Sequence, residues 1–247
     1  MKKQKTKFPF RIIILTIVMG AVVSILFATF DGRPKTASSM ASIPTDYSDA
    51  DLHSFWDTHM KTLVADQWSK AKLPYPELNS RYTQLATQVY QRYGKPFDVE
   101  LVTSYHWASK RVGAAAGINT NGAADVSFFI SAFLDSYKEI QTSTVPEWPR
   151  MWESHVLIIA MHEMEHAAYP SKDTKAIDAE EESRAWTETM RYTVVPLVET
   201  YKMPLAPTEL KFYLAWKASQ GNAESPIWKQ SIMSSYGAID GRKMPEK

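Results

Sequence analysis

The sequence predicts an α+β fold that is mainly helical and contains one small antiparallel sheet. Three observations carry this prediction. Apolar residues recur at helical spacing along most of the chain, the segment after Pro96 changes to strand-like residues, and an Asn-Gly pair interrupts that segment as a hairpin turn would. The chain has 247 residues, of which 45% are hydrophobic, so it can bury a substantial core.

The first predicted element is a transmembrane helix over residues 12–30, "IIILTIVMGAVVSILFATF", which carry no charge and are long enough to cross a bilayer. The basic residues of the tail 1–11 place that tail in the cytoplasm and the rest of the chain on the extracytoplasmic, periplasmic side. A cleaved signal peptide is the alternative, with "TASSMA" as the processing site. The length of the apolar run favours a retained anchor.

A flexible linker over residues 31–47 and a folded domain over residues 48–247 follow the anchor, since the linker is rich in small, polar and proline residues. The first domain helix carries apolar residues at helical spacing from Leu52 to Leu63. A second helix covers 77–93 and stops at Gly94 and Pro96.

Strands are predicted in "FDVELVTSYHW" and in "VGAAAGINTNGAADVSFFI", where two strands meet around Asn121-Gly122. Helix returns from Met151 to Tyr169, closed by Pro170, and again from about Thr174 to Val195, before Pro196. One or two short helices from Thr208 onward complete the domain, with the apolar members Leu210, Tyr213, Leu214 and Trp216.

Composition excludes several classes of function. The chain has no cysteine, so disulfides, thiolate metal sites and cysteine nucleophiles are absent, and any metal is held by nitrogen and oxygen. Five of the 28 basic residues precede Asp31, and the remaining 23 are outnumbered by the 27 acidic residues. A mildly acidic domain without a basic stripe predicts no nucleic-acid partner.

The chemistry of the chain centres on "LIIAMHEMEHAAYP", residues 157–170, which contains the H-E-x-x-H pattern at His162, Glu163 and His166. Four residues of helix bring two side chains round to nearly the same direction, so both imidazoles can bind one ion. Burying a histidine in apolar surroundings without a partner for its polar nitrogens costs free energy, and a bound metal would supply that partner. Glu163 can reach a water on that ion, whereas Glu165 is expected to be a surface or hydrogen-bonded carboxylate.

A third ligand is expected from "DAEEESRAW", because a catalytic zinc has three protein ligands and one open position. Glu182 shares a helical stripe with apolar residues, which makes it the first candidate, and Glu181 is the alternative. Glu180 fits an acidic first turn of the helix.

The motif followed by a glutamate helix resembles the gluzincin class of zinc metallopeptidases, and "ESRA" from Glu182 is similar to the E-x-x-A form of compact members. The resemblance covers His162 to about Val195. It implies one Zn²⁺ per chain bound by His162, His166 and Glu182, with Glu163 as the general base. It also implies a sheet edge that aligns a peptide or protein substrate.

The chain departs from the thermolysin-like members at position 186. Their E-x-x-x-D pattern has an aspartate there, which orients a zinc histidine, whereas this chain has Trp186. The partners of the zinc histidines are therefore not identified from sequence. The implied reaction is zinc-assisted hydrolysis of an amide bond, with Glu163 moving the proton. Candidate oxyanion donors are Tyr105, His106, Tyr169 and Tyr192.

Two other functions compete with a peptidase. A membrane-tethered binding or assembly protein could hold a metal without catalysis, although such a protein has no need of Glu163 as a base. A di-iron carboxylate protein could use the E-x-x-H formed by Glu163 and His166. That site needs a second E-x-x-H, and no other histidine has a glutamate three residues before it.

Overall fold

The computed structural model describes residues 47–66, 73–103, 114–118, 121–143, 145–170 and 179–240. All of these residues belong to one compact unit, Tyr47–Lys247. The predicted basic tail, the predicted anchor and all of the predicted linker except its last residue lie outside the described residues. Within the described ranges, no helix has both the length and the apolar character required to cross a membrane.

A mixed sheet of three strands forms one layer of the domain. The strands are β1 (Asp98–Val102), β2 (Ala114–Ile118) and β3 (Ala124–Phe129), in the spatial order β1-β3-β2. β2 and β3 form the predicted antiparallel hairpin. Gly122 in its turn has a φ of 78°, a left-handed value that glycine adopts without strain. β1 runs parallel to β3, with Val99 opposite Val126.

The prediction of a wholly antiparallel sheet is therefore wrong for β1. The Asn121-Gly122 signal sets only the direction of β2 relative to β3. The sequence has no comparable turn signal between β1 and another strand, so it does not set the direction in which β1 pairs. β3 is the central strand and is buried at almost every position. β2 pairs with one edge of β3, and β1 pairs with the other.

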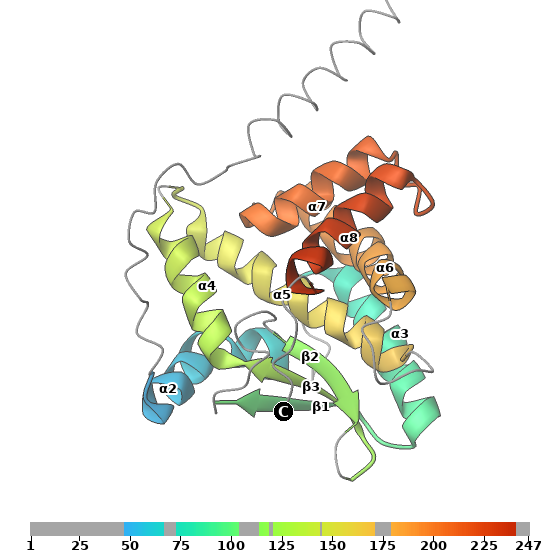
Figure 1. The fold of residues 1–247 in the computed structure, drawn as a ribbon. Helices are drawn as coiled ribbons and strands as arrows, with labels where there is room; N and C mark the ends of the chain where they lie inside the picture. The colour runs from blue at the N-terminus through green and yellow to red at the C-terminus, as the bar shows by residue number, and fades with distance from the viewer. Residues whose placement is uncertain are drawn as a thin grey trace, which may run out of the picture. The chain divides into compact units, whose positions relative to one another are not determined.

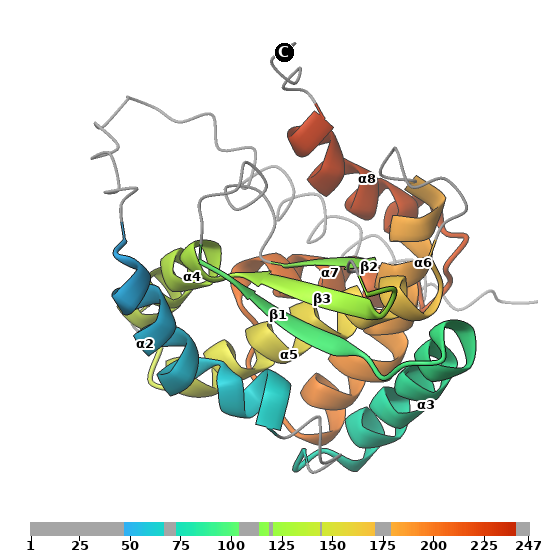
Figure 2. The same cartoon turned by 90° about the horizontal axis from the view of Figure 1, so that it is seen from below.

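Helix α5 (Trp148–Ala168) lies at the centre of the domain. It contacts β2 and β3 on one side, and the hairpin of α7 and α8 lies on the side away from the sheet (Figure 1). α4 packs against one half of α5, and α3 and α6 pack against the other (Figure 1). Figure 2 shows the strands lying over α5. The other described helices are α2 (Asp49–His59), α3 (Pro76–Tyr93), α4 (Ile130–Thr142), α6 (Ala179–Thr189), α7 (Pro207–Ala218) and α8 (Pro226–Asp240), with π-helical turns η1 (Thr62–Asp66), η3 (Met190–Val194) and η4 (Pro196–Thr200).

Local sequence signals explain the helices that were predicted. α3 confirms the helix over 77–93: Pro76 takes its first position, where no N–H donor is needed, and Gly94 ends it with a φ of 67°. α5 confirms the helix from Met151 to Tyr169 and begins slightly earlier, at Trp148. Its apolar residues are buried on nearly all sides because helices and sheet surround it.

Three details differ from the prediction. Ile130 begins α4 instead of ending a strand, because β3 passes directly into a helix with apolar residues at helical spacing. Helical backbone continues past Pro196 to Thr200, because Pro196 takes the first position of a new π turn. Leu210 and Leu214 are 43% and 49% exposed, whereas Phe212 and Trp216 of the same helix point into the core.

Candidate metal centre

Helix α5 brings the two histidines of the motif together. His162 and His166 are one turn apart, and their Nε2 atoms lie 3.2 Å from each other. His162 is only 3% exposed, and the side chain of His166 is 13% exposed. At this separation at most one of the two nitrogens carries a proton directed at the other, so at least one of them offers a free lone pair.

Helix α6 supplies a carboxylate to the same point. Glu182 places Oε2 3.4 Å from Nε2 of His162 and Oε1 3.5 Å from Nε2 of His166. Its side chain is 15% exposed, and its Oε2 atom is buried without a hydrogen bond. We call His162, His166 and Glu182 the donor cluster, since each of them directs one ligand atom into the same small volume.

The spacing of the donor cluster fits a zinc ion. Around a tetrahedral zinc with bonds of roughly 2.0–2.2 Å, neighbouring ligand atoms lie about 3.3–3.6 Å apart. Here the two Nε2 atoms are 3.2 Å apart, and the nearest oxygen of Glu182 lies 3.4 Å from Nε2 of His162 and 3.5 Å from Nε2 of His166, a different oxygen in each case. Among the residues that the structure describes, this is the group of three histidine or acidic side chains whose ligand atoms all lie within 4.8 Å of one another.

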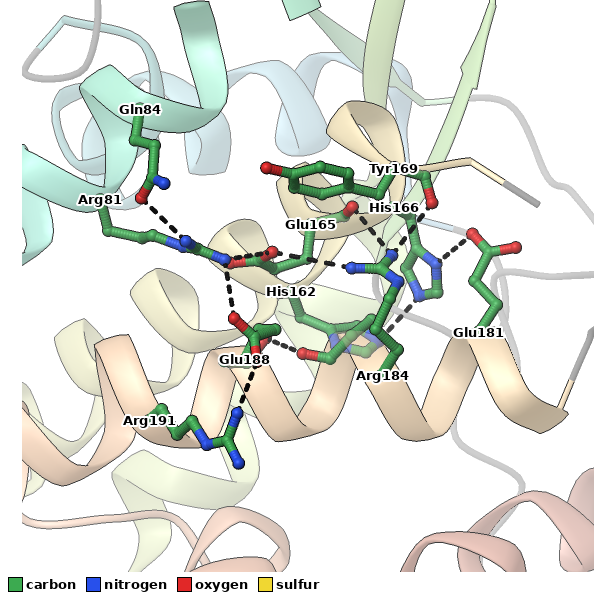
Figure 3. A network of polar contacts seen from close by, with 12 residues as sticks. Arg81, Gln84, His162, Glu165, His166, Tyr169, Glu181, Arg184, Glu188 and Arg191 are labelled. Atoms are coloured by element: carbon green, nitrogen blue, oxygen red, sulfur yellow. Dashed lines mark hydrogen bonds and ion pairs between the residues drawn. The ribbon is translucent and has the colours of Figure 1, made fainter. Parts of the chain in front are cut away.

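Glu181 occupies a different place from Glu182, although the two are adjacent in sequence. Its Oε1 lies 2.8 Å from Nδ1 of His166, the nitrogen that faces away from the donor cluster (Figure 3). A carboxylate on the second nitrogen of a ligating histidine fixes its tautomer and ring orientation. Glu182 is thus the carboxylate near both Nε2 atoms and Glu181 the one that contacts Nδ1 of His166, a distinction that sequence alone left open.

Glu163 lies between the motif helix and the sheet. Its Oε2 accepts a hydrogen bond of 3.0 Å from the backbone N–H of Ala116 in β2. Ala116 is paired with Val126 in β3, yet its N–H points away from β3 toward the carboxylate. Ala116 was not singled out in the sequence, because a backbone donor leaves no signal in residue type.

Burial and neighbouring charge set the protonation of the cluster in the absence of an ion. Burial lowers the pKa of His162 to about 4, so this imidazole is neutral near pH 7 and available as a ligand. His166 also loses hydration, but the carboxylates of Glu182, Glu163 and Glu181 outweigh that loss and raise its pKa to about 9. Burial raises the pKa of Glu163 to about 8. Glu182 is buried too, but the two imidazoles hold its pKa below the usual range.

A second buried polar group lies beside the donor cluster. Glu165 is 1% exposed and accepts two hydrogen bonds from Arg81 of α3, at 2.7 and 2.8 Å (Figure 3). Arg81 also reaches Glu188 at 3.3 Å, and Arg184 approaches Glu165 at 3.8 Å. We call Arg81, Glu165, Arg184 and Glu188 the arginine network. Glu165 is therefore a hydrogen-bonded carboxylate, and the surface alternative is wrong.

The arginine network also holds the end of α5. Arg184 donates hydrogen bonds of 3.1 Å to the backbone carbonyls of Glu165 and Tyr169, which lie at the carboxyl end of that helix. Arg184 is two residues from Glu182, so one short stretch of α6 both supplies the third donor and binds the helix that carries the other two. Arg81 and Arg184 were not identified from the sequence, because charged residues on a predicted helix usually face solvent.

The candidate oxyanion donors fall into two groups. Tyr105 and His106 lie outside the described residues. The other two contact arginines: the guanidinium of Arg81 lies 4.3 Å from the ring centre of Tyr192, and that of Arg184 lies 5.3 Å from the ring centre of Tyr169. Tyr192 is 44% exposed. These contacts assign both rings to the arginine network.

Comparison with protein-family models, with curated proteins and with solved structures returns no match to this chain. Inference about function therefore rests on the residues of the site and on their geometry.

Proposed function

We propose that this protein is a membrane-anchored zinc metallopeptidase of the gluzincin type, with one zinc per chain. His162, His166 and Glu182 are the proposed ligands and Glu163 is the proposed general base. The observation that carries the proposal is the convergence of His162, His166 and Glu182, whose nearest nitrogen and oxygen atoms lie 3.2–3.5 Å apart, with the glutamate of the motif next to them.

The residues divide the chemistry of amide hydrolysis among them. Zinc bound at the donor cluster would lower the pKa of a water molecule and polarise the scissile carbonyl. Glu163 would take the proton of the attacking water on its Oε1, while the Ala116 N–H holds Oε2 in place. The same carboxyl group would then deliver this proton to the nitrogen of the leaving amine.

The position of β2 supports an extended peptide or protein chain as the substrate. β2 is an outer strand in the order β1-β3-β2, and the N–H of Ala116 shows that its outward edge faces Glu163. Backbone groups on an outer strand can pair with an added strand, which would align a peptide along the site. Four of the five residues of β2, Ala114, Ala115, Ala116 and Gly117, have small side chains, as a strand that pairs closely with a substrate would need.

The proposed location follows from residues 1–30. The uncharged run 12–30 would anchor the chain, the basic tail would stay in the cytoplasm, and the peptidase domain would lie on the periplasmic side. The absence of cysteine places no constraint on this location.

Zinc content and peptide hydrolysis of the purified full-length chain, in detergent, test the proposal together. We expect one zinc per chain, hydrolysis of a fluorogenic peptide library, and loss of hydrolysis on treatment with a chelator. Glu182→Ala should lose the zinc. Survival of zinc in Glu182→Ala and its loss in Glu181→Ala would reverse the assignment of the third ligand.

Two outcomes would replace the proposal. Stoichiometric zinc without hydrolysis of any library peptide, with Glu163→Gln indistinguishable from wild type, would support a metal-containing binding or assembly protein. Two irons per chain would support the di-iron class.

A further inference from the structure

Trp186 contacts His162, the first of the two proposed zinc histidines. In the thermolysin-like pattern, position 186 would hold an aspartate. The ring of Trp186 stacks on the imidazole of His162, with ring centres 4.2 Å apart and an angle of 27° between the planes. Both side chains are buried, at 5% and 3% exposure. Trp186 lies one turn after Glu182 on α6, so the same face of that helix carries a donor and an aromatic surface.

The two histidines of the donor cluster are held in different ways. His166 has the carboxylate of Glu181 on its Nδ1, at 2.8 Å. The Nδ1 atom of His162 is buried, and no residue in the described ranges forms a hydrogen bond with it. The usual fixation of a ligating histidine by a hydrogen bond to its second nitrogen is thus found at His166 and not at His162. The flat face of Trp186 is the contact that limits rotation of the His162 ring.

Trp186 is itself fixed from its other side. The ring of Phe212, in α7, lies 4.4 Å from that of Trp186 at 32°, and Phe212 is 3% exposed. Trp186 therefore lies in a stack between His162 and Phe212, and the stack joins α5, α6 and α7. Closely packed aromatic rings hold one orientation, because rotation of any ring would open a gap or cause a clash.

We propose that Trp186 is the positioning residue of His162, and that it sets the direction of the His162 Nε2 atom by ring stacking where a hydrogen-bonded aspartate would otherwise do so. This inference rests on the proposed function, since it assigns a role to Trp186 through a zinc ligand. It predicts that the aromatic face of Trp186, and not merely its volume, controls zinc binding.

The test compares aromatic and non-aromatic replacements in the full-length chain. Trp186→Phe keeps a ring against His162, and Trp186→Met keeps apolar volume without a ring. Trp56→Met is the matched control, because Trp56 is also buried but lies in α2 and packs against Phe128 of β3, outside the stack of His162, Trp186 and Phe212. For each variant we would measure zinc affinity by competition with a chromogenic chelator, the absorption spectrum of bound Co²⁺, and the Tm without metal.

We expect Trp186→Met to bind zinc about 10- to 100-fold more weakly than wild type, the usual effect of removing a partner of a ligating histidine. Its Co²⁺ spectrum should change as the ligand geometry loosens, while Trp186→Phe stays close to wild type in both measurements. Trp56→Met should lower the Tm without changing the zinc affinity or the Co²⁺ spectrum. Phe212→Leu, which loosens the stack without touching His162, should weaken zinc binding in the same direction and provides a test that does not depend on folding of Trp186→Met.

Equal zinc affinity and identical Co²⁺ spectra in Trp186→Met, Trp186→Phe and wild type would overturn the inference while leaving the zinc site itself intact. Equal losses of affinity in Trp186→Met and Trp56→Met would overturn it as well, because they would show an effect of stability alone. A wild-type chain that binds no zinc would overturn the proposed function and this inference with it.

Discussion

The donor cluster and the arginine network are both buried polar groups between α5 and α6, but they differ in how completely their polar atoms are hydrogen-bonded. In the arginine network, each carboxylate oxygen of Glu165 lies against a nitrogen of Arg81. In the donor cluster, the nearest atoms of His162, His166 and Glu182 lie 3.2–3.5 Å apart, and both Oε2 of Glu182 and Nδ1 of His162 are buried without a hydrogen bond. Buried polar groups normally find partners within the protein, so the atoms left without one in the donor cluster support the proposal that a cation binds there.

This difference separates function from stability on a single helix. Glu163 and Glu165 are two residues apart in α5, yet one lies beside the donor cluster and the other is neutralised by arginine. Substitutions in the first group should change metal binding and activity with small effects on folding. Substitutions in the second should change folding with small effects on the metal.

The largest expected effect comes from Glu163→Gln. Loss of the general base should lower kcat by about 10²–10⁴-fold, while zinc content stays at one per chain because the three ligands remain. Steady-state hydrolysis of a fluorogenic peptide and metal analysis of the same sample measure both quantities. A variant that keeps wild-type kcat would show that Glu163 is not the base.

The second effect concerns Arg81, which is 6% exposed and pairs with a glutamate that is 1% exposed. Arg81→Met leaves the Glu165 carboxylate buried without its partner, which should reduce the free energy of unfolding by about 3–5 kcal/mol. Denaturant unfolding followed by tryptophan fluorescence would measure the change. The double variant Arg81→Met/Glu165→Leu is the control, since removal of both charges should recover most of the loss. If Arg81→Met loses less than about 1 kcal/mol of unfolding free energy, the Arg81–Glu165 pair contributes no more than an ordinary surface ion pair.

A smaller effect distinguishes the two neighbouring glutamates of α6. Glu181→Ala removes the partner of His166 Nδ1 and should weaken zinc binding by about 10- to 100-fold. Glu182→Ala removes a ligand and should leave no zinc bound under the same conditions. Competition with a chelator of known affinity measures both. If the two variants lose affinity equally, Glu181 also binds the ion directly.

The smallest effect is expected at the edge of the arginine network. Glu188 is 23% exposed and lies 3.3 Å from Arg81 and 3.0 Å from Arg191. Glu188→Gln should cost about 0–1 kcal/mol of unfolding free energy, as partly exposed ion pairs usually do, and zinc affinity should not change. A change in zinc affinity with unaltered stability would show that the two groups are coupled through α6.

The sequence predicted those parts of the fold and site that local pattern determines. The hairpin of β2 and β3, helix α3 and helix α5 follow from turn residues, caps and apolar periodicity. The convergence of His162 and His166 follows from a spacing of four residues within one helix. Helical projection also placed Glu182 on the inward face, and the structure brings it to the histidines.

The remainder depends on contacts between distant segments. The direction of β1 is set by its place beside β3 and not by its own residues. The roles of Arg81 and Glu165 required α3 and α5 to be side by side, although the two residues are 84 positions apart. Trp186 was visible only as a missing aspartate, because stacking of a ring on His162 leaves no motif in the sequence.

The most direct test of the account is a zinc titration of the metal-free, full-length wild-type chain beside Glu182→Ala, with metal content measured after removal of free ion. The account predicts one tightly bound zinc per wild-type chain and none in the variant, because the donor cluster supplies three ligands that converge on one ion. A wild-type chain that retains no zinc, or a variant that retains as much zinc as wild type, would contradict it.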